Sequence, residues 1–232
     1  MDRQNRQIRG LSSMATRQIL AELAAHIGEA HGIPVEFEAG GGVAIAQRIR
    51  EGAPGDVAVL AEGALAKLAS EGHVVAETVR PLWVSQVVVA VPTGAPVPPL
   101  ATESDLRAAL LGAARIGYST GPSGTALIEL IARLGLADVL GGRLVQAPPG
   151  VPVGTLLASG EAGLAFQQHS ELMDLPGVFV VGPLPGDTAI AATFGGAVMT
   201  VSEDPARARE VLGLLGSAAG AEVAEARGMR AV

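Results

Sequence analysis

Two long apolar segments without a charged side chain limit what this chain can fold into. Residues 82–91 read LWVSQVVVAV, and residues 188–201 read TAIAATFGGAVMTV. Both are shorter than the roughly 20 apolar residues that cross a bilayer, and Gly195-Gly196 interrupts the second. We therefore predict two buried strands and no membrane insertion. A complete set of helical and strand-like segments lies between them, which predicts two lobes joined by two crossing strands.

Strand-like and helical segments alternate along the rest of the chain. Alternation of this kind is typical of an α/β fold with a largely parallel sheet. The expected fold is therefore a two-lobed α/β clamshell. Ligands of open α/β sheets bind beyond the carboxyl ends of the strands, so the cleft between the lobes is the expected site. The predicted lobes are residues 1–83 with 193–232, and residues 84–192.

Composition argues against several classes of function. The formal net charge is −7, the chain has one Trp, one Tyr and four Phe, and no run of Lys or Arg occurs, which argues against a nucleic-acid surface. No Cys is present and the four His are scattered, so no metal site and no cofactor are predicted. The N-terminal sequence has no apolar stretch of the kind found in a signal peptide. The sequence as written is thus expected in the cytoplasm, or in the periplasm if an export signal was removed.

Four strand-to-helix junctions are rich in Gly, Ser and Thr. They are residues 10–16, 38–44, 118–125 and 147–155. Such residues are ordinary helix caps, but helix starts also carry unpaired N–H groups and about half a positive charge, which together attract anions. The repetition of the pattern predicts a site for a small anion that needs no cluster of Lys or Arg.

Several segments resemble bacterial periplasmic molybdate-binding proteins, a type II solute-binding family. The most specific is GGGVAIAQRIREGAPGDVAVLAEGALAKLASEGHV at residues 40–74, and SGEAGLAFQQHSEL at 159–172 and LLGSAAGAEVAEARGM at 214–229 are similar to later family segments. The resemblance covers nearly the whole chain. It implies two α/β lobes that close on a ligand, and an ABC permease as the partner if the protein is exported.

The chain departs from that family at its ligand-binding positions. The family's second-turn Ser falls on Gly42 or Val43, and its binding Tyr falls on Gln168. Ser12-Ser13 occupy the first turn, although an ungapped count places Ala15 at the family's Ser. Hydroxyl donors for tetrahedral molybdate are therefore missing, and a carboxylate is the expected ligand. Aconitate isomerase is similar to the same broader family, which leaves an isomerase of an unsaturated tricarboxylate as the alternative.

The candidate ligand-binding residues come from these junctions. Arg17 can pair with a carboxylate through two hydrogen bonds, and Gln168 can donate its amide; a solvated helix face and a hydrogen bond to backbone are their ordinary alternatives. The turn at Ser123 is expected to face the cleft opposite Ser12-Ser13, with free backbone N–H groups. The predicted ligand-binding residues are Ser12, Ser13, Arg17, Gly41, Gly42, Ser123, Gly124, Thr125 and Gln168.

An isomerase would also need a base, and the sequence offers only His169 and Glu38 as candidates. His169 follows a predicted strand, where an exposed loop His is the simpler interpretation. Glu38 lies beside a Gly run, on what the alternation with Val35 and Phe37 predicts to be the wet face of a strand. Asp56 and Trp83 are predicted to be structural. The two hypotheses are thus an anion-binding receptor or sensor and an isomerase on the same scaffold.

Overall fold

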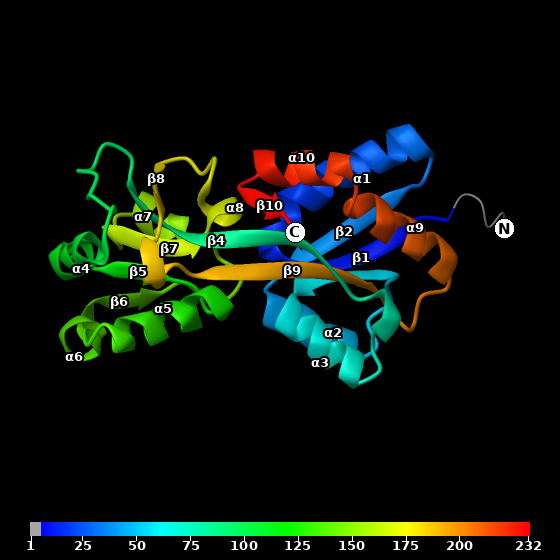
Figure 1. Ribbon diagram of the computed structural model, residues 1–232, viewed down its shortest axis with the longest axis horizontal. Coiled ribbons are helices and arrows are strands. Elements are labelled where there is room, and N and C mark those ends of the chain that lie inside the picture. Colours follow the sequence, from blue (N-terminus) through cyan, green and yellow to red (C-terminus); the bar gives the residue numbers. More distant parts are fainter. Residues whose placement is uncertain (1–5) are drawn as a thin grey trace. The chain divides into compact units, whose positions relative to one another are not determined.

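The computed structural model of the chain describes residues 6–232, which form a mixed α/β fold in two units (Figure 1). The first unit runs up to Ser85 and resumes at Ala192, and the second unit spans Gln86–Ala191. The lobes expected from the sequence, 1–83 with 193–232 and 84–192, begin and end within two residues of these positions.

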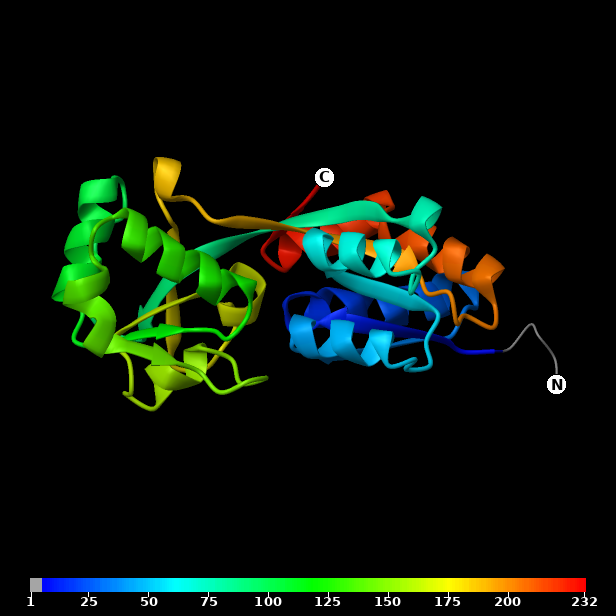
Figure 2. The same cartoon turned by 90° about the horizontal axis from the view of Figure 1, so that it is seen from below.

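Two long strands carry the chain from one unit to the other. β4 (Arg80–Pro92) begins in the first unit and ends in the second, and β9 (Ala191–Val198) starts at the point of return. They are the long teal-to-green strand and the long orange strand in Figures 1 and 2. β9 falls within one of the two uncharged apolar segments, and the other segment forms most of β4.

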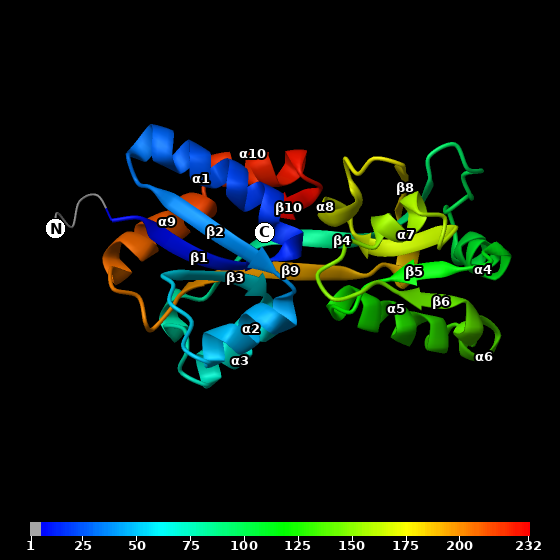
Figure 3. The same ribbon diagram turned by 180° about the vertical axis from the view of Figure 1, so that it is seen from behind.

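The first unit is built around the parallel strands β2, β1 and β3, with β9 antiparallel to β3 (Figure 3). Its helix ends follow local chemistry: Gly32 closes α1 in the left-handed conformation, with φ 65°, and its N–H bonds to the carbonyl of Gly28. Its elements are β1 (Ile8–Ser13), α1 (Arg17–His31), β2 (Val35–Gly40), α2 (Gly42–Arg50), β3 (Val57–Ala61), α3 (Glu62–Ser70), α9 (Pro205–Leu215), α10 (Ala218–Ala226) and β10 (Met229–Ala231), with 3-10 turns at Met14–Thr16 and Ala76–Thr78.

Alternation along the strands gives the first unit a core on each face of its sheet. Val57 and Val59 of β3 pack with α1 and α9, whereas Ala58 and Leu60 pack with α2 and α3. Figures 1 and 3 show α1, α9 and α10 along one side of these strands and α2 and α3 along the other. Trp83 is 1% exposed and belongs to the core on the side of the sheet that α1 covers, which confirms its predicted place in a core.

The second unit repeats this plan. β5 lies between the parallel strands β6 and β7, and β4 pairs antiparallel with β7 and β8. Its elements are α4 (Glu103–Gly112), β5 (Ile116–Tyr118), α5 (Pro122–Arg133), α6 (Ala137–Leu140), β6 (Leu144–Gln146), α7 (Gly154–Ala158), β7 (Leu164–Gln168), α8 (His169–Leu172) and β8 (Val178–Pro183), with 3-10 turns at Gly141–Arg143 and Gly186–Thr188.

Strand alternation again divides the core of the second unit. Val87 and Val89 of β4 pack on the side of α4 and α5, and Val88 and Ala90 pack on the side of α7. Thr102 begins α4 with a capping box, because its hydroxyl accepts from the Asp105 N–H and the Asp105 carboxylate accepts from the Thr102 N–H.

The expectation of a largely parallel sheet is wrong. Among the described residues, β3–β9, β4–β7, β4–β8 and β4–β10 are antiparallel, and the sheet is mixed. A parallel neighbour needs a crossover connection, usually a helix. β9 follows β8 after only a 3-10 turn, and β4 enters the second unit before any of that unit's helices. The direction of these strands is set by the two crossings, which the alternation of helices and strands does not reveal.

Candidate ligand-binding site

In the first unit, β1 and β2 end side by side, and a helix follows each of them. Ser13 is paired with Gly40 in the parallel register. Ser12 and Ser13 are both buried. The Ser12 hydroxyl donates to the carbonyl of Glu38 at 3.4 Å, so its hydrogen is engaged within the sheet. The Thr16 hydroxyl donates to the Ser13 carbonyl at 3.1 Å. With the Thr16 hydrogen engaged, the Ser13 hydroxyl is the donor in its 3.5 Å contact with Thr16 Oγ1, a long bond that a ligand acceptor would replace.

The start of α2 supplies backbone donors beside Ser13. The first hydrogen bond of this helix runs from the Ile45 N–H to the Gly41 carbonyl, so the N–H groups of the preceding turn have no acceptor within the helix. A Cβ added to Gly42 would lie 3.7 Å from the Ser13 Cβ, which places this turn against the serine. Gly41 and Gly42 leave the turn without side chains, and a ligand can reach its N–H groups.

Arg17 follows Ser13 by four residues, at the end of the turn between β1 and α1. It is the first residue of α1, its side chain is exposed, and within residues 6–232 it makes no ion pair. The interpretation of Arg17 as a ligand-binding residue therefore remains a prediction.

In the second unit, the corresponding place is the junction of β5 and α5. The hydroxyls of Ser119 and Ser123 lie 2.9 Å apart, and Ser119 Oγ also accepts from the Gly121 N–H at 3.3 Å. A hydroxyl carries one hydrogen. Whichever serine donates to the other, one hydrogen of the pair stays available for an external acceptor.

The free N–H groups expected at Gly124 and Thr125 are a prediction that the structure contradicts. Both donate to the Gly121 carbonyl, at 3.0 and 3.2 Å. Gly121 is the N-cap, and its carbonyl accepts the first bonds of α5, as in any helix. Gly124 also packs closely against the preceding turn: an added Cβ would lie 1.9 Å from the backbone carbonyl oxygen of Ser119. Its lack of a side chain is thus explained by backbone packing rather than by a ligand.

Gln168 ends β7 and carries an unsatisfied polar atom. The residue is 4% exposed, and its Oε1 has no hydrogen-bond partner within the described part of the chain. Leu164 and Phe166, on the same face of the strand, pack in one core cluster with the α5 residues Leu127 and Leu130. Because β5 and β7 are parallel and their pairing ends at Tyr118 and Phe166, Gln168 lies beyond the end of β5, still paired with Val87 of β4, on the face that α5 covers.

Gln167 points to the other face, and both ends of its amide are bonded. Its Oε1 accepts from the Val153 N–H at 2.7 Å, and its Nε2 donates to Glu171 Oε2 at 2.6 Å. The Thr155 N–H bonds to the Pro152 carbonyl. The junction at 147–155, proposed from its composition as an anion-attracting turn, therefore has its donors at Val153 and Thr155 engaged within the protein.

Glu171 is the described carboxyl whose pKa departs most from its usual value. Burial raises its pKa to about 7, and the hydrogen bond from Gln167 offsets part of that rise. The sequence analysis did not select it, since an isolated Glu in a short helical segment gives no sign of burial.

The two candidate bases differ in their surroundings. Arg48 donates to both carboxylate oxygens of Glu38, at 2.5 and 2.9 Å, and these hydrogen bonds hold the pKa of Glu38 below its usual value. A carboxylate held in this way is a weaker base, which argues against the suggested role. His169 is half-buried at the start of α8 and interacts within the protein.

Asp56 is structural, as predicted. Its carboxylate accepts from the Arg9 N–H at 3.0 Å and from the Ser202 hydroxyl at 2.7 Å, and the side chain is fully buried. Sequence reasoning missed Ser119 as the partner of Ser123, although both lie in the junction at residues 118–125. It also missed Gln18 in α1, whose Oε1 is buried without a partner among the described residues.

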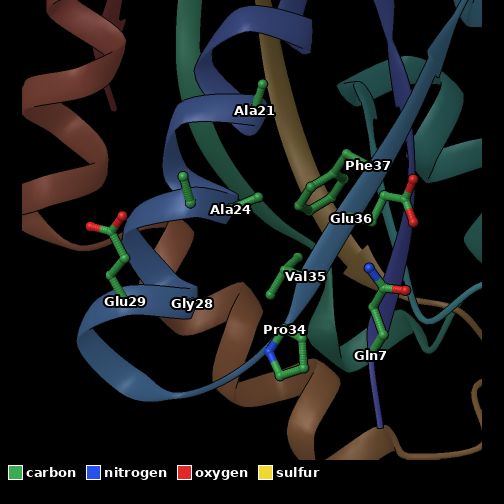
Figure 4. A pocket seen from close by; sticks show the side chains of 10 residues that line it. Gln7, Ala21, Ala24, Gly28, Glu29, Pro34, Val35, Glu36 and Phe37 are labelled. Carbon is green, nitrogen blue, oxygen red and sulfur yellow. The ribbon is translucent and has the colours of Figure 1, made fainter.

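A hollow of about 450 Å³ lies in the first unit between α1 and β2, where Val35 and Phe37 point toward Ala21 and Ala24 (Figure 4). None of the predicted ligand-binding residues lines it. Among residues 6–232, no group of three or more His, Cys, Asp or Glu is placed to hold a metal ion. In the same part of the chain, every helix is too short or too polar to cross a membrane.

Comparisons with known proteins agree on one family. The family described as bacterial extracellular solute-binding protein matches residues 8–230. An aconitate isomerase from a Pseudomonas species is 30% identical over 230 residues, covering 96% of this chain and 87% of that protein.

Two solved structures share the fold. The periplasmic molybdate-binding protein of Azotobacter vinelandii superposes with a TM-score of 0.80 at 20% identity, over 96% of this chain and 98% of that one. The sulfate-binding protein SubI of Mycobacterium tuberculosis gives 0.79 at 15% identity, over 97% of this chain and 87% of that one.

Proposed function

This chain belongs to the family of bacterial extracellular solute-binding proteins, and we propose that it binds a small carboxylate anion. The observation that carries the proposal is Gln168, a buried amide without a partner for its Oε1, on the sheet face covered by α5. Buried polar atoms in native proteins are nearly always hydrogen-bonded. A ligand at the carboxyl ends of β5 and β7 would supply the missing partner through a donor group that it carries beside its carboxylate, since an ionised carboxylate only accepts hydrogen bonds.

Each unit has neutral donors of its own. In the first unit they are the Ser13 hydroxyl and the N–H groups at the start of α2, beside Gly41 and Gly42. In the second unit, the hydroxyl pair of Ser119 and Ser123 provides one hydrogen. Hydrogen bonds to a charged acceptor are stronger than neutral ones. Arg17 would add a planar cation that matches a carboxylate in geometry.

A carboxylate fits these groups better than molybdate does. In the molybdate-binding family that the sequence resembles, a Ser and a Tyr donate hydroxyls to the oxyanion. Here those positions hold Gly42 or Val43 and Gln168. An amide and a guanidinium are planar groups that bind planar carboxylates, whereas a tetrahedral oxyanion needs donors from several directions.

Titration calorimetry with molybdate, sulfate, citrate and aconitate tests the proposal. We expect a carboxylate to bind more tightly than either oxyanion, and at 100 times its dissociation constant to stabilise the chain by about 2.7 kcal/mol. Submicromolar binding of molybdate with no response to carboxylates would contradict the proposal.

Isomerisation of an unsaturated tricarboxylate is the second candidate, favoured by the 30% identity to an aconitate isomerase over 96% of this chain. A 1,3-proton shift needs a group that exchanges a proton near neutral pH. Glu171, with its pKa raised to about 7, has the pKa that such a group needs, and His169 is two residues away in α8.

Proton NMR of a mixture of the chain with one aconitate isomer tests this second candidate. Appearance of the other isomer, and its loss in Glu171→Gln, would support catalysis. Binding without conversion would favour the receptor.

The family supports a proposal for the compartment and the partner. Its members are described as extracellular, and the Azotobacter relative as periplasmic. We propose the same compartment and the permease of an ABC transporter as the partner. Recovery of the protein from the periplasmic fraction, bound to a membrane complex, would support this; an exclusively cytoplasmic location would contradict it.

A further inference from the structure

The two adjacent glutamines at the end of β7 are in opposite situations. Gln167 has both ends of its amide bonded, to the Val153 N–H and to Glu171, which fixes the orientation of that amide. Gln168 is equally buried, at 4% exposed, yet its Oε1 receives no hydrogen bond within the described chain. Nothing in the packing of the strand explains why the second amide should be left open.

In the orientation that the structure gives the Gln168 amide, the unsatisfied buried atom is Oε1, an acceptor, and this restricts which ligand group can satisfy it. Molybdate, sulfate and a fully ionised carboxylic acid present only acceptors of their own. An acceptor facing an acceptor is repulsive, so none of these groups alone would pair with Oε1. A hydroxyl group of the ligand would.

The surroundings complement a ligand that has both kinds of group. The pair of Ser119 and Ser123 leaves one hydroxyl hydrogen to donate, and Gln168 provides an acceptor in the same unit.

We propose that Gln168 Oε1 accepts a hydrogen bond from a hydroxyl of the ligand, so that the chain selects hydroxycarboxylates over carboxylates that lack the hydroxyl. This inference rests on the proposed carboxylate binding and adds the chemical class of the ligand. A site built to bond a hydroxyl rejects the analogue that lacks it, because the buried partner is then left unpaired.

Calorimetry with matched acids tests the inference on the full chain. The pairs are malate against succinate, and citrate against propane-1,2,3-tricarboxylate, which differ only in the hydroxyl. For at least one pair we expect the hydroxy acid to bind the unaltered chain about tenfold more tightly or better. In Gln168→Met, which keeps the length of the side chain and removes its polar atoms, the two acids of that pair should bind within about twofold of each other.

Two controls separate selectivity from folding. Gln47→Met changes an exposed glutamine of α2 that bonds only to Glu51, and it should keep the preference for the hydroxy acid. The empty Gln168→Met chain should melt no lower than the unaltered one, because the substitution removes an unsatisfied acceptor. A lower melting temperature would mean that the amide is bonded within the protein.

The outcomes distinguish this inference from the proposed function. If carboxylates bind but both acids of each pair bind equally, the selectivity inference is wrong and the carboxylate site stands. A preference that persists in Gln168→Met also overturns it. If no carboxylate of either pair binds, both proposals fail.

Discussion

Replacing Glu171 with Gln should change how the stability of this chain depends on pH. The carboxyl of Glu171 is buried, its pKa is raised from 4.5 to about 7, and it accepts a hydrogen bond from Gln167. The folded state therefore holds the proton of Glu171 more tightly than the unfolded state does. Stability from this group is fully present below the unfolded pKa of 4.5 and is lost as the pH rises through about 7.

The size of the effect follows from the rise in pKa. A rise from 4.5 to about 7 is about 2.5 pKa units, and each unit corresponds to about 1.4 kcal/mol. The free energy of unfolding should therefore fall by about 3 kcal/mol at most between pH 4.5 and pH 8 because of Glu171. A Gln at this position can still accept the bond from the Gln167 amide, but it does not titrate. The free energy of unfolding of Glu171→Gln should therefore increase relative to that of the unaltered chain as the pH rises.

Urea unfolding of both proteins at several pH values measures this difference directly. The other carboxyl groups titrate in both chains, so the difference between the two unfolding free energies isolates Glu171. Glu129→Gln, at an exposed position of α5, is measured in the same way as the matched Glu-to-Gln control. Parallel stability curves for the unaltered chain and Glu171→Gln would refute the reasoning.

The remaining predictions concern the turns that we propose to bind the ligand. Gly124→Val should lower the stability of the empty chain by about 1–3 kcal/mol or more in calorimetric melts, because its Cβ would lie 1.9 Å from the Ser119 oxygen; an unchanged melting temperature would contradict this packing. Ser119→Ala and Ser123→Ala should each cost little affinity, since either serine alone keeps one hydrogen, whereas the double substitution should cost about 0.5–3 kcal/mol of binding. Additive losses in the double-mutant cycle would show that the hydroxyls act separately. Glu38→Gln should leave the anion affinity and any isomerisation rate within about twofold of those of the unaltered chain. The Glu38 carboxylate is bonded to Arg48 in an exposed ion pair, which contributes little to stability.

The sequence was sufficient for the architecture because the fold depends on patterns that are local. Apolar spacing indicated the alternation of helices and strands, β9 lies within one uncharged segment, and the other segment forms most of β4. The short elements α6, α8 and β10 were not predicted, since three or four residues contain too little of any period to be recognised. The antiparallel pairings were missed because the partner of a strand depends on chain direction across the crossings.

The candidate site was predicted less completely, because its chemistry depends on partners that are distant in sequence. Ser13 and Gly42 were selected from composition, and the structure places them together. Whether an N–H group is free depends on whether a nearby carbonyl accepts a hydrogen bond from it. The N–H of Gly124 is not free, because it donates to the Gly121 carbonyl. The opposite behaviour of Gln167 and Gln168 depends on Val153 and Glu171, which no sequence motif connects to them.

β4 supplies side chains to three cores in a single run of thirteen residues. Trp83 belongs to the first unit, while Val87 and Val88 point to opposite faces of the second. Adding or deleting one residue between Trp83 and Val87 would exchange those two faces for every later position of the strand. Most connections between domains vary freely in length among related proteins. This one has to keep its length, so that natural variation along it is confined to exchanges of one side chain for another.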